Sequence, residues 1–466
     1  MLRKLIFTLG LVLAAILVYG GVYLSSVLNA GSGFSAKNIC SGYFLSGMPG
    51  EQIVDEVLIP TVPVLSKISY EIDKENRWVD TWFFGFSQRR AVFSEGTGCT
   101  LLRAGREQLQ RKLELAGFSQ LDEALSWPQG SAPAPVGIKL EPLLEQAFAE
   151  PDPSNMRHTK AIVVIHKGRL VAEKYAPEVD ALTPLPGWSM AKSVTNLLIG
   201  RLINDGKLRL TQTAPIPRWY EETGDPRGYI TIDQLLRMSS GLEFDETYSL
   251  YSDVTRMLSV EADAAGFAAS KPLVADPGSV WAYSSGTSNI LSGIIRLTVG
   301  GYMQDYYDFA QEQLFLPLGI HTASLETDDH GTYVGSSFMY ASARDWARLG
   351  QFCLQGGWWQ GERLLPEGWI TYSTTPTPNN PRNNYGAHFW LNADPKGGKQ
   401  QRTWPDLPAD AYSMNGFQGQ RVIIIPSKDM VVVRLGFSSN SNRGIEPLVA
   451  GLIDVLAPDR AVASIP

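Results

Sequence analysis

The sequence contains few of the residues that bind metals or nucleic acids. Its five histidines are never three to five positions apart, and neither a CxxC nor an HExxH motif occurs among the 466 residues. We therefore expect no metal site, and nothing in the sequence requires a cofactor. Lys and Arg number 40 against 47 Asp and Glu, which gives a net charge of −7, and there is no basic run. Binding to nucleic acid is therefore disfavoured.

Charged residues are also scarce, at 19%, whereas hydrophobic residues make up 44%. A disordered chain shows the opposite balance, because it buries too little apolar surface to fold. At roughly 150 residues per domain, the chain has room for about two or three domains, or for one large domain with additions. The composition therefore predicts a folded protein with a sizeable core.

The first thirty residues contain the longest hydrophobic run. Arg3 and Lys4 precede a stretch without charge from Leu5 to about Leu28, which is long enough for the roughly 20 residues of a membrane-spanning helix. We interpret residues 1–29 as an uncleaved anchor in the inner membrane. A cleavable secretion signal is the alternative, although only the weak Leu28-Asn29-Ala30 resembles a cleavage site. The positive charges predict that the remaining chain is exported to the periplasm.

Only three cysteines are present. Export permits a disulfide, and we predict one between Cys40 and Cys99. Cys353 lies with Leu349 on the apolar face of an expected helix, so we interpret it as a buried free thiol.

A change in composition divides the exported chain. Residues 30–134 alternate short apolar runs with turns, which predicts a small β-rich extension. Ser126–Gly137 is rich in Pro, Gly, Ala and Ser and is typical of a linker. The main domain is therefore expected over residues 135–466.

The main domain combines helical and strand patterns. Hairpins are predicted over residues 161–176 and 419–437, and helices over residues 141–150, 189–205 and 447–456. This mixture predicts an α/β fold of the α+β type, in which an antiparallel sheet is flanked by helices. A helical subdomain is expected at about residues 204–313, with the site in the crevice between the two parts.

Ser189 and Lys192 stand three positions apart at the start of a long expected helix. Residues with this spacing share a helix face, so the lysine can reach the serine hydroxyl. The free N–H groups and positive dipole at a helix start favour a developing oxyanion and a neutral lysine. Apolar residues that follow at helical spacing would bury Lys192 and lower its pKa further. The alternative interpretation is a helix-capping serine beside a surface lysine.

Two downstream segments carry further polar groups. Tyr283-Ser284-Ser285-Gly286 lies in a polar turn before an apolar helix, where the phenol can transfer a proton. By itself, such a turn is more often a capping loop with a hydrogen-bonded tyrosine. Asn415 and Gly416 precede a strand, and the glycines there let a ligand approach the strand closely. By itself, this segment is only a glycine-containing start of a strand.

Together, and in this order, the three segments resemble the motifs of the serine β-lactamase and penicillin-binding-protein superfamily: SxxK, then Y-x-N or Y-x-S, then a strand with K-T-G. The chain is most similar to the class C-like branch, which includes esterases, D-aminopeptidases and 6-aminohexanoate-dimer hydrolase. The resemblance covers about Pro135–Asp459. It implies a β-lactamase/transpeptidase-like fold and a hydrolase that forms an acyl-serine intermediate.

The resemblance also assigns roles to individual residues. It implies that Ser189 is the nucleophile, Lys192 the general base, and Tyr283 the group that exchanges protons with the leaving group and with water. Ser285 stands at the position of the asparagine or serine that orients the lysine in the superfamily. The backbone N–H groups of Ser189 and Phe417 would form the oxyanion hole. Substrate contacts are assigned to Ser285, Asn415 and Gly416.

One departure from the superfamily pattern bears on the substrate. Met414 and Asn415 stand where the Lys and Thr of K-T-G bind the carboxylate of a penicillin or of a peptidoglycan stem. The sequence therefore predicts an esterase or amidase that acts on a small molecule with a small or uncharged acyl group. It does not predict an efficient β-lactamase or D,D-peptidase.

Three other functions are weighed against this one. A D,D-peptidase or β-lactamase is the enzymatic alternative, and a non-catalytic envelope binding module with the same fold is the non-enzymatic one. An α/β-hydrolase elbow at Gly187–Ala191, with His388 in a triad, is disfavoured. Such an elbow follows a buried strand, and Pro184 and Pro186 do not suit one.

Overall fold

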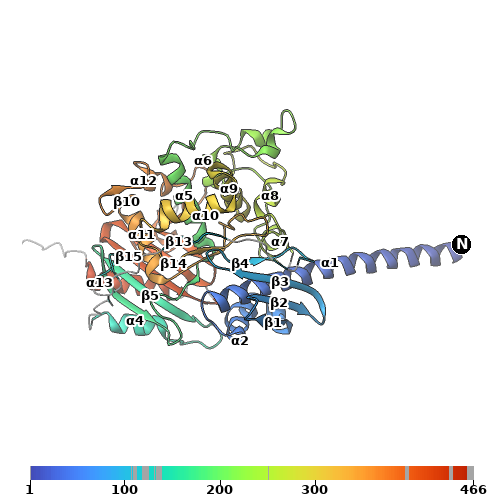
Figure 1. The fold of residues 1–466 in the computed structure, drawn as a ribbon, viewed down its shortest axis with the longest axis horizontal. Helices are drawn as coiled ribbons and strands as arrows, with labels where there is room; N and C mark the ends of the chain where they lie inside the picture. The colour runs from blue at the N-terminus through green and yellow to red at the C-terminus, as the bar shows by residue number, and fades with distance from the viewer. Residues whose placement is uncertain are drawn as a thin grey trace, which may run out of the picture.

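Strands from distant parts of the chain meet in one antiparallel sheet (Figure 1). The computed structural model describes residues 2–106, 108, 113–117, 125–130, 132, 139–249, 251–393, 398–439 and 444–458. The six strands of the main sheet lie in the order β12-β13-β14-β15-β5-β6. They are β5 (Thr159–His166), β6 (Arg169–Tyr175), β12 (Trp390–Leu391), β13 (Tyr412–Gly416), β14 (Gln420–Ile425) and β15 (Met430–Gly436).

Two hairpins of β-branched residues form the centre of this sheet. β14 and β15 are joined by the turn Pro426–Lys428 and by Asp429, which adopts the left-handed conformation that such a turn requires. β15 pairs with β5, so that Val432 lies opposite Val164, and β5 turns through Lys167 and Gly168 into β6. Both hairpins predicted from the sequence are therefore present.

Side chains from the two faces of the sheet enter two separate hydrophobic clusters. Val163 and Val433 pack into the larger cluster, together with helices α5 (Ala191–Asn204) and α11 (Ala343–Leu354). Their neighbours in the strands, Val164 and Val432, point to the other face of the sheet. There the smaller cluster is closed by α4 (Glu141–Phe148) and α13 (Ile445–Leu456).

A mostly helical region covers the side of α5 away from the sheet. α9 lies at its centre and packs against α5, α6 and α8. Its helices are α6 (Ile232–Leu236), α7 (Asp253–Ser259), α8 (Ala264–Ala269), α9 (Ser285–Val299) and α10 (Met303–Ala310), with short turns at Pro217–Tyr220, Pro226–Tyr229 and Gln311–Phe315. A sheet flanked by helices and paired with a helical region is the architecture predicted from the sequence.

Several short elements complete this part of the chain. A three-stranded sheet in the order β7-β9-β8 lies beside the start of α5. The remaining elements are β7 (Leu185–Pro186), β8 (Ser324–Leu325), β9 (Met339–Ala341), β10 (Trp358–Trp359), β11 (Glu362–Arg363) and α12 (Trp369–Ser373).

The extension before the main domain contains both helices and strands. Strands β1 (Ser69–Asp73), β2 (Trp78–Phe83), β3 (Phe86–Ser94) and β4 (Gly98–Leu101) form an antiparallel meander. Residues 30–67, which fall in the segment predicted to be β-rich, are mainly helical: α1 (Leu2–Phe44) is followed by helical turns between residues 50 and 67. Small residues let α1 pack closely, since a Cβ on Gly33 would meet the Ser259 carbonyl oxygen at 2.0 Å. The boundary expected at residues 134 and 135 lies outside the described residues.

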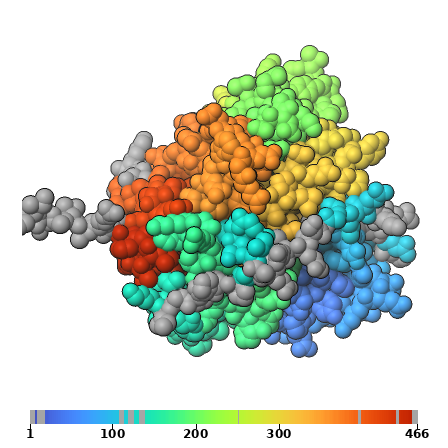
Figure 2. Space-filling view, turned by 60° about the vertical axis from the view of Figure 1, so that its left-hand side comes forward, coloured from blue at the N-terminus to red at the C-terminus, as the bar shows by residue number. Residues whose placement is uncertain are grey.

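The extension packs directly against the rest of the chain (Figure 2), and polar contacts of Glu326 join the two parts. The predicted bond between Cys40 and Cys99 is present and joins α1 to β4, and Cys353 is a buried free thiol. The buried carboxylate of Glu326 forms an ion pair with Lys37. It also accepts hydrogen bonds from the Ser41 hydroxyl and from the Cys99 N–H, both at 2.7 Å.

The first part of α1 projects from the body of the protein (Figure 1). Within the part of the chain that the structure describes, no helix meets the length and hydrophobicity needed to cross a membrane. The anchor predicted over residues 1–29 is therefore not supported by the structure.

Candidate active site

Ser189 lies in a tight turn that leads into α5. The turn, Trp188–Met190, follows the two-residue strand β7, which pairs antiparallel to β9. Gly187 permits close packing here, because a Cβ would lie 2.3 Å from the Trp346 ring. Its neighbours are buried, but Ser189 is partly exposed. The sequence thus places one hydroxyl at the surface of a rigid turn.

The turn differs from an α/β-hydrolase elbow. β7 is short and antiparallel, as Pro184 and Pro186 suggested. The imidazole of His388 forms hydrogen bonds with the Ser288 hydroxyl at 2.8 Å and with the Leu236 carbonyl oxygen at 2.7 Å. Both ring nitrogens therefore have partners other than Ser189, and this histidine is part of the buried polar packing.

Lys192 lies one helical turn beyond Ser189 and is only 1% exposed. Its Nζ lies 3.2 Å from the Ser189 Oγ, 3.0 Å from the Ser285 Oγ and 2.9 Å from the Ser336 carbonyl oxygen. Burial lowers the pKa of Lys192 to about 8, although the nearby Glu246 carboxylate acts in the opposite direction. The interpretation of Lys192 as a surface lysine is therefore wrong. A substantial fraction of Lys192 is neutral in mildly alkaline solution, and a neutral amine can accept a proton from the serine hydroxyl.

Tyr283 faces the same pair of residues. Its ring centroid is 4.8 Å from the Lys192 Nζ, and a hydrogen bond links its side chain with Ser189. The Tyr283 ring packs edge-on against Tyr385 at 5.6 Å and is tilted by 36° against Trp390 at 5.4 Å. Burial raises the pKa of Tyr283 well above its usual value, so the phenol keeps its proton when Lys192 loses one.

Ser285 connects the lysine to a carboxylate that sequence analysis missed. The backbone N–H and the hydroxyl of Ser285 donate to the two carboxylate oxygens of Glu246, at 2.7 and 2.5 Å. Burial raises the pKa of Glu246, and the charge of Lys192 opposes that shift. Glu246 lies in an irregular loop without a periodic pattern or a motif, so no signal in the sequence identifies it. Ser336, which offers only its backbone carbonyl oxygen, gives no sequence signal either.

The segment that resembles K-T-G lies beside the nucleophile turn. Asn415 and Gly416 end β13, and a Cβ on Gly416 would be 2.1 Å from the Gly187 carbonyl oxygen. The Asn415 Oδ1 is buried, and no described residue donates a hydrogen bond to it. Phe417 follows with a ring that is 36% exposed and lies 5.6 Å from the Trp188 ring. All of the predicted site residues therefore come from elements that meet around Ser189.

The described residues contain no cluster of three or more His, Cys, Asp or Glu side chains that could hold a metal ion. The chemistry available to this site comes from hydroxyl, amine, phenol and carboxylate groups.

Comparison with known proteins places this arrangement in a family. The family model described as beta-lactamase matches residues 144–448. The 6-aminohexanoate-dimer hydrolase of Paenarthrobacter ureafaciens is 25% identical over 348 residues, which are 68% of this chain and 84% of that protein.

Solved structures share the fold. A Bacillus anthracis protein assigned as a 6-aminohexanoate-dimer hydrolase has a TM-score of 0.53 and 23% identity, over 75% of this chain and 88% of its own. EstCE1, described as a hydrolase with promiscuous acyltransferase activity, has a TM-score of 0.50 and 16% identity, over 67% of this chain and 96% of its own. The chain belongs to the beta-lactamase family, and the predicted serine-hydrolase type is confirmed.

Proposed function

We propose that this member of the beta-lactamase family hydrolyses an ester or amide through an acyl group on Ser189. The observation that carries the proposal is the buried Lys192 amine, 3.2 Å from the Ser189 Oγ and with its pKa lowered to about 8. A lysine that merely stabilised the fold would be expected to keep its charge and to pair with a carboxylate. Lys192 instead contacts two hydroxyls and a carbonyl oxygen.

In the proposed acylation step, neutral Lys192 accepts the hydroxyl proton while the Ser189 Oγ attacks the carbonyl carbon of the substrate. The backbone N–H groups of Ser189 and Phe417 are assigned to the developing oxyanion. As the carbonyl carbon loses its alcohol or amine, Tyr283 gives its proton to that leaving group and recovers one from Lys192. Water then attacks the acyl-serine, its proton passes back through the same groups, and the acid is released.

Ser285 and Glu246 are proposed to position Lys192 rather than to react. The Ser285 hydroxyl accepts from the lysine at 3.0 Å and donates to Glu246 at 2.5 Å, so its orientation is fixed from both sides. The nearby carboxylate also moderates the fall in the Lys192 pKa.

An ester or linear amide is favoured over a β-lactam or a peptidoglycan stem. Met414 and Asn415 provide neither the cation nor the hydroxyl that would bind a substrate carboxylate. The names of the Paenarthrobacter relative and of EstCE1 as hydrolases support the same substrate class.

A labelling experiment and a substrate panel test the function together. A fluorophosphonate should label Ser189 in the full chain and should not label the Ser189→Ala variant. Nitrophenyl esters and linear amides should be turned over faster than a penicillin. Absence of both labelling and turnover would favour the non-catalytic binding module, and rapid penicillin hydrolysis with little ester turnover would favour a β-lactamase.

We further propose that the domain works in an oxidising compartment outside the cytoplasm. The bond between Cys40 and Cys99 supports this location, since disulfides persist mainly in such compartments. The protein should be quenched in acid, denatured and alkylated without a reductant. Only Cys353 should then be labelled, because the two cysteines of the disulfide cannot react. Labelling of all three cysteines in freshly extracted protein would contradict the proposal.

A further inference from the structure

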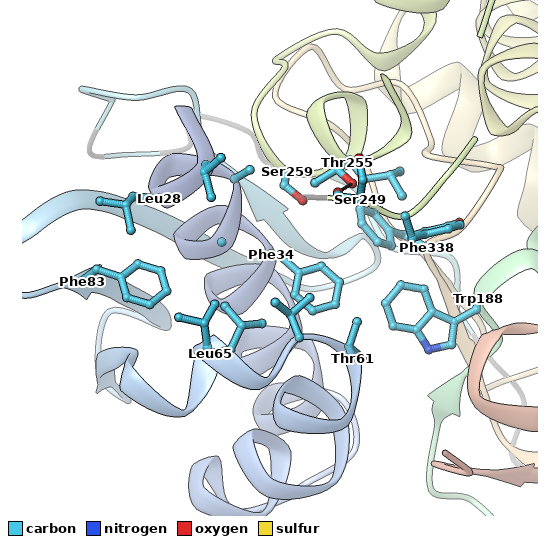
Figure 3. Close-up of a pocket in the computed structure, with 17 residues that line it drawn as sticks. Leu28, Phe34, Thr61, Leu65, Phe83, Trp188, Ser249, Thr255, Ser259 and Phe338 are labelled. Carbon is cyan, nitrogen blue, oxygen red and sulfur yellow. Dashed lines mark hydrogen bonds between the residues drawn. The ribbon is translucent and has the colours of Figure 1, made fainter. Parts of the chain in front are cut away.

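An apolar pocket separates the extension from the helical region (Figure 3). Its cavity volume is about 80 Å³. Leu28, Phe34 and Leu65 line one wall, and Trp188 and Phe338 line the opposite wall. The pocket thus exists only because the extension faces the main domain.

Three of the polar groups in the pocket wall have partners within the protein. The Thr61 hydroxyl donates to the Val57 carbonyl oxygen at 2.6 Å, and the Thr255 hydroxyl donates to the Ser249 carbonyl oxygen at 2.8 Å. The Ser259 carbonyl oxygen accepts from the Arg89 guanidinium at 3.0 Å. A ligand in this pocket would therefore make mainly apolar contacts, which suits an aliphatic chain.

One wall of the pocket lies next to the candidate active site. Trp188 immediately precedes Ser189, and its ring contacts Phe34 at 6.2 Å and Phe417 at 5.6 Å. Tyr248, also in the wall, stacks on Phe417 with ring centroids 6.2 Å apart. The pocket is therefore bounded by the neighbour of the nucleophile and by rings packed on the assigned oxyanion-hole residue.

We propose that this pocket binds the aliphatic acyl chain of the substrate, so that the enzyme prefers medium- or long-chain acyl esters or amides over acetyl compounds. The inference rests on the proposed function. Ser189 and Phe417 are assigned to the acyl carbonyl group, whereas Tyr283 is assigned to the leaving group. The part of a substrate closest to Trp188 and Phe417 is therefore its acyl chain.

The extension is the source of this specificity. Leu28, Phe34 and Leu65 lie outside residues 144–448, which the family model matches. On α1, Val22 and Leu24 are exposed one turn before Val27 and Leu28, which line the pocket. This apolar stretch of helix gives a hydrocarbon chain a continuous surface along which to enter.

A chain-length series measures the occupancy of the pocket. For nitrophenyl esters kept below their aggregation limit, kcat/KM should rise about threefold to fourfold for each added methylene from acetate to octanoate. A flat or falling profile, with normal hydrolysis of the acetate, would overturn the inference and leave the proposed function intact.

Two pairs of variants locate the effect. Ser249 is exposed at the pocket wall, so the larger side chain in Ser249→Trp should block the acyl chain of the substrate. Octanoate turnover should fall about tenfold or more, whereas acetate turnover should be unchanged. Ser249→Ala is the matched control. Val64→Asp places a charge in the wall at a side chain that is 54% exposed, and should act in the same way. Val455→Asp in α13 introduces the same charge elsewhere and should have no effect. Equal loss of acetate and octanoate turnover in Ser249→Trp and Val64→Asp would contradict the assignment.

A binding readout separates this inference from the proposed function. Decanoic acid that carries a diazirine should crosslink the full-length Ser189→Ala variant within residues 27–83 or 248–259, or at Trp188 or Phe338, whether or not the wild-type protein hydrolyses esters. Crosslinks confined to other segments, or none at all, would overturn the inference. If crosslinking occurs there but no ester or amide is hydrolysed, the pocket stands and the hydrolase proposal fails.

Discussion

The two sides of Ser189 are built in different ways. On one side, Lys192, Ser285 and Glu246 form a buried chain of hydrogen bonds in which each polar group has a partner. On the other side, Trp188 opens onto an apolar pocket with a wall that comes from the extension. The first side lies within the segment shared with the family, whereas the second depends on residues before it. We therefore expect reaction chemistry and substrate choice to respond to different substitutions in this protein.

The largest expected effect is on the polar side. Lys192→Arg keeps a positive charge but cannot lose its proton at working pH, because the guanidinium pKa exceeds about 12. Turnover should fall close to background for esters of every chain length. In the wild-type protein kcat/KM should rise with pH through an ionisation near 8, the pKa to which burial lowers Lys192. Near-native turnover by Lys192→Arg would exclude lysine as the base.

Loss of the phenol should have the next largest effect. Tyr283→Phe keeps the ring contacts with Tyr385 and Trp390 but removes the proton that reaches the leaving group. We expect kcat to fall about 10²–10⁴-fold, with a smaller change in KM. Steady-state kinetics with a good and a poor leaving group check this role, since the deficit should be larger for the poor one. An equal deficit for both would show that the phenol does not protonate the leaving group, and an unchanged kcat would assign Tyr283 to packing alone.

Opening the disulfide should affect mainly the apolar side. Replacement of Cys40 and Cys99 by serine should lower the free energy of unfolding by about 2–4 kcal/mol. It should also reduce the preference for octanoate over acetate, because the extension supplies one pocket wall. Thermal unfolding and the two kcat/KM values measure these effects, and reduced wild-type protein is the control. A loss of acetate turnover in the folded double variant would show that the two sides are coupled.

Burial of Lys192 should also give a pH-dependent cost in stability. Its pKa is about 8 in the folded protein and about 10.5 when it is unfolded, so the unfolded chain binds more protons between these values. The cost is therefore complete below pH 8 and disappears as the pH rises towards 10.5. Lys192→Met should be more stable than the wild type at pH 7, and chemical denaturation should show this gain shrinking from pH 8 to 10. A gain that did not change with pH would mean that burial does not shift this ionisation.

The smallest expected effect is that of the positioning carboxylate. Glu246→Gln can still accept hydrogen bonds from Ser285 but removes the negative charge that raises the pKa of Lys192. The pH profile of kcat/KM should move to lower pH, with a smaller loss of turnover than in Tyr283→Phe. An unchanged profile would show that the charge of Glu246 has no influence on the pKa of Lys192.

The motif residues could be found from the sequence because their spacing carries information. Ser189 and Lys192 share a helix face, and the β-branched runs of β14 and β15 specify a hairpin wherever they occur. Glu246 could not be found in this way, since it reaches Ser285 from an irregular loop 39 residues earlier. The segment Ser189–Thr195 contains no carboxylate, so the sequence next to Lys192 gives no sign of an acid that opposes the fall in its pKa.

The extension shows why local patterns can mislead. Apolar runs separated by turns indicated strands, and β1 to β4 lie within residues 69–101 of this segment. Gly31 and Gly33 give residues 31–44 a low helix propensity, yet these residues continue α1. Their small side chains let the helix approach neighbouring elements, so tertiary packing outweighs local propensity there.

Trapping the intermediate tests the central claim most directly. The wild-type protein should be mixed with nitrophenyl octanoate, quenched in acid during turnover and digested, with the Ser189→Ala variant treated in parallel. Mass spectrometry is expected to find one octanoyl group on the peptide that contains Ser189, and none on the variant. Octanoate release at the full rate with no acyl group on Ser189, or with the acyl group on another residue, would contradict the account.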